Sequence, residues 1–283
     1  MRGEGLDAAV RLPDGRSLSY RECGAPGGTP VFFFHGMPGS RYQCPDDGVA
    51  LEQRVRLIAP ERPGYGLSDA PPESYSFASW ARDVGALAAA LGIDRFAVAG
   101  YSIGGVFALA CAHELPRRVT EVGLIGSLAP LDVPGNWQGL GSVRGLYELA
   151  QKDLDGLRRA LESLTTPEAF LGALAETICE SDRRLLDESP LRDRFLRDCR
   201  ETLRRGSGVV LREFVLAAHP WGINVSRIAV PTTLWHGLDD INAPPAMAQY
   251  LAANIPGCRA RFYPAEGHLL MFAHWREILT ALA

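Results

Sequence analysis

Residues 100–105 read Gly-Tyr-Ser-Ile-Gly-Gly and lie between two apolar stretches. Residues 95–99 (Arg-Phe-Ala-Val-Ala) have the character of a buried strand, and residues 106–112 (Val-Phe-Ala-Leu-Ala-Cys-Ala) have that of a helix. A strand, a tight Gly-x-Ser-x-Gly turn and a helix form the context in which such a serine is a nucleophile. We therefore predict that Ser102 has a strained backbone and an exposed hydroxyl, beside a helix N-terminus that favours an anion. The alternative is a glycine-rich turn with an incidental serine.

The composition is that of an ordinary globular protein. The chain has 283 residues, of which 47% are hydrophobic and 22% charged, and its formal net charge is −4. This charge gives no reason to expect a nucleic-acid partner or an anionic membrane partner. No stretch reaches the roughly 18 apolar residues needed to cross a bilayer. We expect a small-molecule substrate and leave open a homodimer.

Six cysteines are scattered along the chain, without a CxxC pair and without the spacing of a Cys/His metal site. We therefore expect neither a metal nor a cofactor. Unpaired thiols suit a reducing compartment, and residues 1–7 lack the apolar core of a signal peptide. The expected location is the cytoplasm.

Alternating strand and helix patterns predict a mostly parallel sheet wrapped by helices. Residues 8–22 favour a hairpin, and the apolar runs at 30–34, 56–60 and 121–126 are typical of strands buried on both faces. From about residue 130 to residue 227 the chain instead carries Arg, Asp, Glu and Leu at helical spacing, and it shows no convincing buried strand. We interpret this block as a helical insertion over one edge of the sheet.

The insertion carries acid-before-base pairs four residues apart, Asp193/Arg197 and Glu201/Arg205. An arginine-rich anion site is one interpretation. Acids and arginines are nearly balanced here, however, so we predict a solvated helix face.

A serine hydroxyl needs a base beside it, and histidine has the suitable pKa. Among the six histidines, His268 follows the last predicted strand on a loop. Parallel strands bring their C-terminal ends to one crevice, so a histidine at this place can reach Ser102. We predict His268 as the base, with His274 as the alternative. His35 and His236 end strands before a glycine, and either can be structural.

The base must be oriented by an acceptor on its second ring nitrogen. Asp239 and Asp240 follow a predicted strand in the same crevice, and only one of them can point inward. Asp240 is the first choice, Asp239 the alternative and Asp132 a third candidate. Both neighbouring acids could instead cap the helix near Pro244.

A tetrahedral intermediate needs two N–H donors for its oxyanion. One is the backbone N–H of Ile103, directly after the serine. The other is expected from the loop at residues 35–40, His-Gly-Met-Pro-Gly-Ser. The N–H of Met37 is the candidate, because Pro38 has none to donate.

These motifs together resemble those of the α/β-hydrolase family. Residues 35–39 resemble its oxyanion loop, residues 61–69 the loop after its fourth strand, and residues 100–105 its nucleophile elbow. Residues 236–240, His-Gly-Leu-Asp-Asp, resemble its acid loop, in which the acid is normally the third residue after the glycine. Residues 266–268, Glu-Gly-His, match its histidine loop, and the order Ser, Asp, His is also that of the family.

The resemblance implies the α/β-hydrolase fold, with a mostly parallel eight-stranded sheet flanked by helices and a helical cap inserted after the sixth strand. Residues 1–129 and 228–283 then form the core domain, and residues 130–227 form the cap domain. The resemblance also selects Asp240 as the catalytic acid, and it implies that the cap shapes the substrate pocket.

Serine at position 102, where dehalogenases and epoxide hydrolases of this family place an aspartate, implies an acyl-enzyme. The leading hypothesis is a hydrolase of a carboxylic ester, lactone or related acyl bond, with Ser102, His268 and Asp240 as its triad. The alternatives are a proline iminopeptidase-like amidase or peptidase, a C–C bond hydrolase, a cofactor-free perhydrolase and a non-catalytic ligand-binding relative. Tyr101, Ile103 and Met37 depart from the typical iminopeptidase motifs, which weakens the peptidase alternative.

The expected substrate pocket is apolar. Its candidate lining residues are the aromatic residues of the insertion and two residues beside the predicted triad, namely Trp137, Tyr147, Phe170, Phe195, Phe214 and Trp221, with Tyr101 and Leu269. For the aromatic residues, burial in the core of the cap is the competing interpretation.

Overall fold

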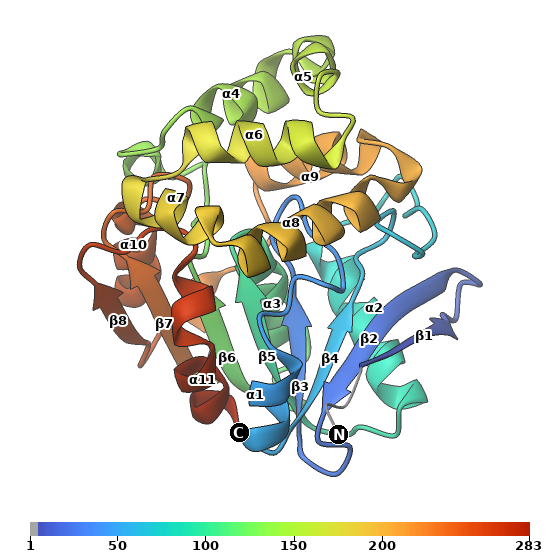
Figure 1. Ribbon diagram of the computed structural model, residues 1–283. Coiled ribbons are helices and arrows are strands. Elements are labelled where there is room, and N and C mark those ends of the chain that lie inside the picture. The colour runs from blue at the N-terminus through green and yellow to red at the C-terminus, as the bar shows by residue number, and fades with distance from the viewer. Residues whose placement is uncertain (1–4) are drawn as a thin grey trace.

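An eight-stranded sheet forms the centre of the computed structural model, which describes residues 5–283 (Figure 1). Residues 1–4, which belong to the segment expected to lack a signal-peptide core, lie outside the described residues. The strand order is β1-β2-β4-β3-β5-β6-β7-β8, and all neighbours are parallel except β1 with β2 and β2 with β4. The predicted mostly parallel sheet is confirmed. The strands are β1 (Leu6–Arg11), β2 (Ser17–Gly24), β3 (Thr29–Phe34), β4 (Val55–Pro60), β5 (Phe96–Tyr101), β6 (Val119–Ile125), β7 (Thr232–Gly237) and β8 (Arg259–Tyr263).

Helices cover both faces of the sheet, and β3 shows why. Phe32 and Phe34 belong to the hydrophobic cluster on one face, whereas Val31 and Phe33 belong to the cluster on the other. Successive side chains of a strand point to opposite faces, so an apolar run is stable only where both faces are covered. The covering helices are α1 (Asp47–Glu52) and α11 (Leu270–Leu282) on one face, and α2 (Phe77–Ala90), α3 (Gly104–Glu114) and α10 (Pro245–Asn254) on the other.

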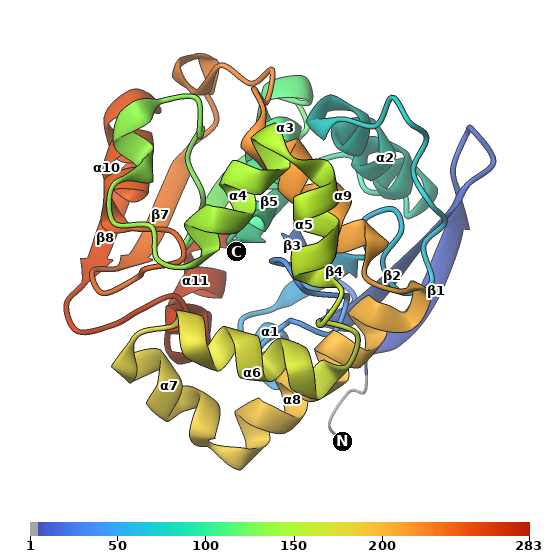
Figure 2. The ribbon, with the colours of Figure 1, turned by 90° about the horizontal axis from the view of Figure 1, so that it is seen from above.

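The chain between β6 and β7 is helical and lies above the end of the sheet at which the parallel strands finish (Figure 1). We call residues 130–227 the cap segment. In Figure 2, α4, α5 and α9 form one group, and α6, α7 and α8 form a second group. The elements of the cap segment are η1 (Pro134–Trp137), α4 (Val143–Lys152), α5 (Leu154–Leu161), α6 (Pro167–Thr177), α7 (Glu180–Asp187), α8 (Ser189–Thr202), η2 (Leu203–Arg205), α9 (Gly208–Ala218) and η3 (Val225–Arg227).

The cap segment shares its hydrophobic core with the rest of the molecule. Tyr147 and Phe214 belong to the same cluster of buried side chains as Phe77 and Phe107 of the sheet-covering helices. The division into two domains at residues 130 and 227 therefore stays a prediction. None of the helices in residues 5–283 has the length and apolar character that crossing a membrane requires.

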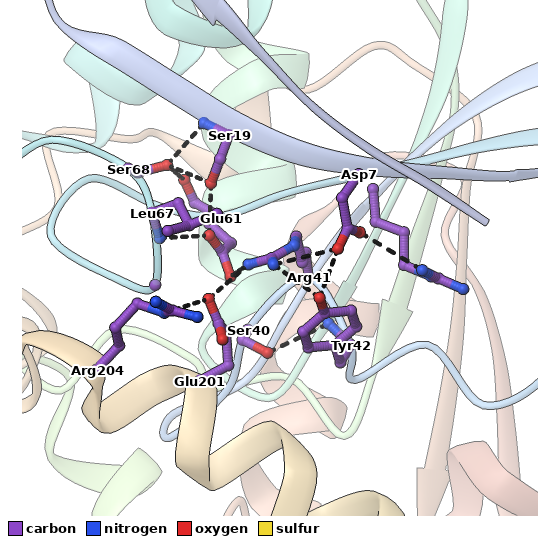
Figure 3. A network of polar contacts seen from close by, with 12 residues as sticks. Asp7, Ser19, Ser40, Arg41, Tyr42, Glu61, Leu67, Ser68, Glu201 and Arg204 are labelled. Atoms are coloured by element: carbon purple, nitrogen blue, oxygen red, sulfur yellow. Dashed lines mark hydrogen bonds and ion pairs between the residues drawn. The ribbon is translucent and has the colours of Figure 1, made fainter.

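Arg41 connects the sheet to the cap segment through a buried polar network (Figure 3). Its guanidinium donates to Glu61, after β4, at 2.5 Å and to Glu201 of α8 at 2.7 Å. Glu61 also accepts hydrogen bonds from the Ser19 hydroxyl and the Leu67 N–H. Moving α8 away would separate Arg41 from Glu201 and remove one partner of a buried charge. The network therefore favours the arrangement in which the cap segment lies against the loops after β3 and β4.

The predicted solvated face of α8 is found only in part. Asp193 and Arg197 are exposed, as expected. Glu201 is buried and bonds Arg41 and Arg204, so the prediction of a solvated Glu201/Arg205 pair is wrong. The periodicity located the charged positions, but it could not reveal that an arginine from another segment lies against Glu201.

A second buried ion pair joins Arg62, after β4, to Glu213 of α9. Two guanidinium nitrogens of Arg62, Nε and Nη2, each donate to one carboxylate oxygen of Glu213, and the Tyr65 hydroxyl donates to the same carboxylate. Arg62 also donates to the backbone carbonyls of His35 and Gly36. The pair therefore links the cap segment to the loop that follows β3.

We expect Glu213→Ala to destabilise the protein by about 3–5 kcal/mol, because it leaves the Arg62 guanidinium buried without its partner. Urea unfolding followed by fluorescence measures the loss. Glu148→Ala is the matched control, because Glu148 forms an exposed helical pair with Arg144, and the substitution should lower the free energy of unfolding far less. Equal losses of unfolding free energy in the two variants would contradict the prediction that the buried pair contributes more than the exposed pair.

Candidate active site

Ser102 lies at the tip of the turn between β5 and α3. Its φ of 56° is in the left-handed region, which residues other than glycine rarely adopt and which is typical of functional sites. Two glycines permit the turn. A Cβ on Gly100 would lie 2.0 Å from the carbonyl oxygen of Gly104, and one on Gly104 would lie 2.1 Å from that of Phe34. The predicted strain at the serine is confirmed.

His268 and Asp240 form a buried hydrogen bond of 2.7 Å between Nδ1 and Oδ2. His268 comes from the loop after β8, and Asp240 comes from the loop after β7. The other oxygen of Asp240 accepts the backbone N–H groups of Asn242 and Ala243, each at 2.9 Å. These contacts fix the carboxylate, so that its second oxygen points at the imidazole.

The two alternative acids lie elsewhere. Asp239 is exposed, and Asp132 is exposed beside a different cavity. The structure therefore brings Asp240, rather than either alternative, to His268.

The buried pair is electrostatically coupled. Burial by itself would raise the pKa of Asp240, but the charge and hydrogen bond of His268 lower it below its ordinary value. Burial would likewise lower the pKa of His268, but Asp240, and after it Asp182, raise it above its ordinary value. A proton arriving on His268 is therefore stabilised by an adjacent carboxylate.

The other buried histidines bond the backbone. His236 contacts the carbonyl of Ala243 at 2.7 Å, and His35 contacts that of Gly36 at 2.9 Å. Burial lowers the pKa of both imidazoles, so they are neutral near pH 7. His274, the alternative base, bonds Glu266 on the surface side of α11.

A cavity of about 400 Å³ brings Ser102 and His268 together under the cap segment. Its wall includes Met37 and Ile103, the predicted oxyanion donors. Among the described residues, neither of their backbone N–H groups donates to another group. The Ser102 hydroxyl and the His268 imidazole are not hydrogen bonded to each other, and such contacts often form only when substrate is bound.

Five of the predicted pocket residues line this cavity, namely Tyr101, Tyr147, Phe170, Phe195 and Phe214. Tyr101 also lies against the catalytic candidate, because its ring centroid is 5.0 Å from that of His268. The wall thus combines the end of β5 with helices from both groups of the cap segment.

The prediction for three other pocket residues is corrected. Trp137 lines a separate surface cavity, and Trp221 packs edge-on against Phe77 in the hydrophobic core. Leu269 is fully buried in a cluster with side chains of α6, α7 and α8. Apolar side chains suit a core as well as a pocket, so residue type alone could not separate the two.

Three buried acids of the cap segment contact the loops of the site, and the sequence analysis did not find them. Asp182 bonds the histidine loop, Asp198 bonds the loop that carries Met37, and Glu213 bonds Arg62. The chain contains 33 acidic residues, and no local pattern distinguishes these three. Their contacts depend on the way the cap segment folds back.

Asp198 shows how such a contact reaches the oxyanion loop. Its carboxylate accepts hydrogen bonds from the Ser40 hydroxyl at 2.5 Å and from the Gln43 amide at 3.0 Å. The amide oxygen of Gln43 in turn accepts the N–H of Gly36, which precedes Met37. Burial raises the pKa of Asp198 to about 7. A helix of the cap segment thus holds the loop expected to bind the oxyanion.

Comparison with known proteins agrees with this architecture. A family model described as alpha/beta hydrolase fold matches residues 29–274. The AB hydrolase superfamily protein YisY of Bacillus subtilis is 27% identical over 266 residues, which are 90% of this chain and 91% of YisY. The solved structure of the esterase EaEST from Exiguobacterium antarcticum is similar to this chain with a TM-score of 0.72 and 22% sequence identity. The similarity covers 98% of this chain and 98% of EaEST.

Another relative is matched over a shorter span. The uncharacterized hydrolase YNR064C of Saccharomyces cerevisiae is 30% identical over 114 residues, which are 40% of this chain. The match spans only 39% of that protein. The similarity to it therefore concerns less than half of either molecule.

Proposed function

The chain belongs to the alpha/beta hydrolase fold family, and from this premise we propose that it is a serine hydrolase that cleaves a neutral carboxylic ester or lactone. The observation that supports the proposal is the buried His268–Asp240 pair, whose histidine lines the same cavity as the strained Ser102. A nucleophile, a base and an orienting acid are the groups that acyl transfer requires.

In the proposed reaction the Ser102 hydroxyl attacks the acyl carbon while His268 takes its proton. Asp240 stabilises the imidazolium, and the N–H groups of Met37 and Ile103 bind the oxyanion. The imidazolium then gives its proton to the leaving alkoxide, which leaves an ester on Ser102. Water, deprotonated by His268, then attacks the carbonyl carbon of that ester. The bond between the acyl carbon and the Ser102 oxygen breaks, the imidazolium returns its proton to this oxygen, and the carboxylic acid leaves.

The lining of the cavity supports a neutral substrate. None of the described residues that line it is Asp, Glu, Lys or Arg, and most are apolar. A charged substrate group would lose its hydration there without gaining a partner, which is costly. The proline iminopeptidase-like alternative is weakened, because the ammonium of an N-terminal residue would find no carboxylate.

The size of the cavity supports a small substrate. A volume of about 400 Å³ lies within the range of small-molecule sites. At about 30 Å³ for each water-sized group, it has room for about a dozen such groups. Esters of short to medium acyl chains fit this size.

We expect the purified protein to hydrolyse p-nitrophenyl butyrate, and Ser102→Ala to lower kcat by a factor on the order of 10⁴ or more, because the nucleophile is removed. A fluorophosphonate probe should label the wild type and leave the Ser102→Ala variant unlabelled. Ser142→Ala is the matched control, because Ser142 lines the same cavity and has no assigned role. Undiminished turnover in Ser102→Ala would rule out the proposed nucleophile.

The two neighbouring acids allow a paired test. Asp240→Asn should lower kcat on the order of 10³–10⁴-fold, since an amide no longer favours the productive tautomer of His268. Asp239→Asn should change kcat less than about twofold, because Asp239 is exposed. Circular dichroism checks that both variants are folded. A larger loss in Asp239→Asn would reverse the assignment.

Substrate charge provides a separate test. We expect kcat/KM for p-nitrophenyl butyrate to exceed that for the anionic p-nitrophenyl hemisuccinate by at least about tenfold, because each unpaired polar group costs roughly 1–3 kcal/mol. The cationic prolyl p-nitroanilide should be turned over more slowly still. Preferential hydrolysis of the prolyl compound would favour the peptidase alternative.

A further inference from the structure

Helix α7 of the cap segment touches the loop that carries His268. The Oδ2 atom of Asp182 accepts the backbone N–H of His268 at 2.6 Å, and its Oδ1 atom accepts that of Leu269 at 2.8 Å. Asp182 is buried. A Cβ on Gly267 would lie 2.3 Å from the Asp182 carboxylate and 2.2 Å from the sulfur of Cys179. The helix and the loop are thus in direct contact, with no space between them.

These two N–H groups precede α11, which begins at Leu270. At a helix start, a Ser, Thr, Asp or Asn side chain in the residue before the helix commonly accepts a hydrogen bond from an N–H group of the first turn. Here the residue before the helix is Leu269, which provides no such side chain. The N–H groups of His268 and Leu269 lie before the first helical residue, and their acceptor is Asp182, 86 positions before His268. The backbone of the histidine loop is therefore held by the cap segment rather than by its own sequence.

We propose that Asp182 is a positioning residue, which holds the backbone of the histidine loop so that the His268 ring stands between Asp240 and Ser102. The inference rests on the proposed function, because it assigns Asp182 a role in the same reaction. If Asp182 has this role, the proposed site is active only while α7 lies against the histidine loop. A shift of about 1 Å at a catalytic group can cost roughly a hundredfold in rate.

Charge gives Asp182 an effect that packing alone would not have. Its carboxylate, like that of Asp240, favours the protonated form of His268. Burial raises the pKa of Asp182 itself, and the hydrogen bonds from Leu269 and His268 oppose that rise. The titratable groups around His268 are Asp240 after β7, Asp182 and Cys179 at the start of α7, His236 of β7 and Tyr101 of β5.

The sign of the pH effect follows from the role of His268 as a base. The kcat/KM value rises with pH as His268 loses its proton. Removing the negative charge of Asp182 lowers the pKa of His268, so the neutral base becomes available at lower pH. The acidic limb of the profile should therefore move to lower pH in Asp182→Asn. Hydration of the ring through loosened packing would instead raise the pKa of His268 and move the limb to higher pH.

The test compares Asp182→Asn and Asp182→Glu with the wild type on p-nitrophenyl butyrate. We expect Asp182→Asn to lower kcat by roughly 10–100-fold with KM nearly unchanged, and to shift the acidic limb to lower pH. Asp182→Glu should restore the acidic limb. Asp187→Asn is the matched control, because Asp187 lies exposed on the same helix, and it should behave as the wild type.

Histidine NMR titration gives a readout that needs no substrate. The His268 resonances should titrate at lower pH in Asp182→Asn than in the wild type. An unmoved titration and acidic limb in folded Asp182→Asn would overturn the proposal, even if its Tm fell. If wild-type protein neither hydrolyses esters nor reacts with the fluorophosphonate, the proposed function fails, and the NMR titration still decides whether Asp182 controls His268.

Discussion

The close contact between β5 and α3 is the constraint on which the rest of the molecule depends. Backbone atoms of Gly104 and Gly105, at the start of α3, occupy the space that a side chain on Gly100 would need. The chain can turn this sharply only with Ser102 in the left-handed region, which fixes the serine at the end of a central strand. Parallel neighbours then bring the loops after β3, β7 and β8 to the same edge.

Those loops do not hold their positions alone. Asp182 of the cap segment bonds the loop after β8, and Asp198 bonds the loop after β3. Glu213 bonds Arg62, which in turn donates to the backbone of the loop after β3. A buried charged side chain is costly unless it is paired with an opposite charge. Displacing the cap segment would therefore separate several buried charged groups from their partners at once. The residues of the cavity wall and the groups that hold the loops of the candidate site thus belong to the same cap segment.

The sheet and the central residues of the site could be predicted because their signals are local. Apolar runs predicted strands buried on both faces, and glycine spacing marked the turn at Ser102. The position of His268 after the last strand indicated the edge on which it lies. The roles of Asp182 and Asp198 could not be predicted, because their partners lie 86 and 158 positions away. Residue type also failed for Trp221, since an aromatic side chain fills a hydrophobic core as well as a pocket.

The placement of the cap segment has a consequence for synthesis on the ribosome. Strand β6 ends at Ile125, and β7, its neighbour in the sheet, begins only at Thr232. At about 5–20 residues per second, this edge of the nascent sheet waits roughly 5–20 s for its partner. Ser102, the proposed nucleophile, is also made long before His268, its proposed base, so the proposed site is complete only after the last strands are made.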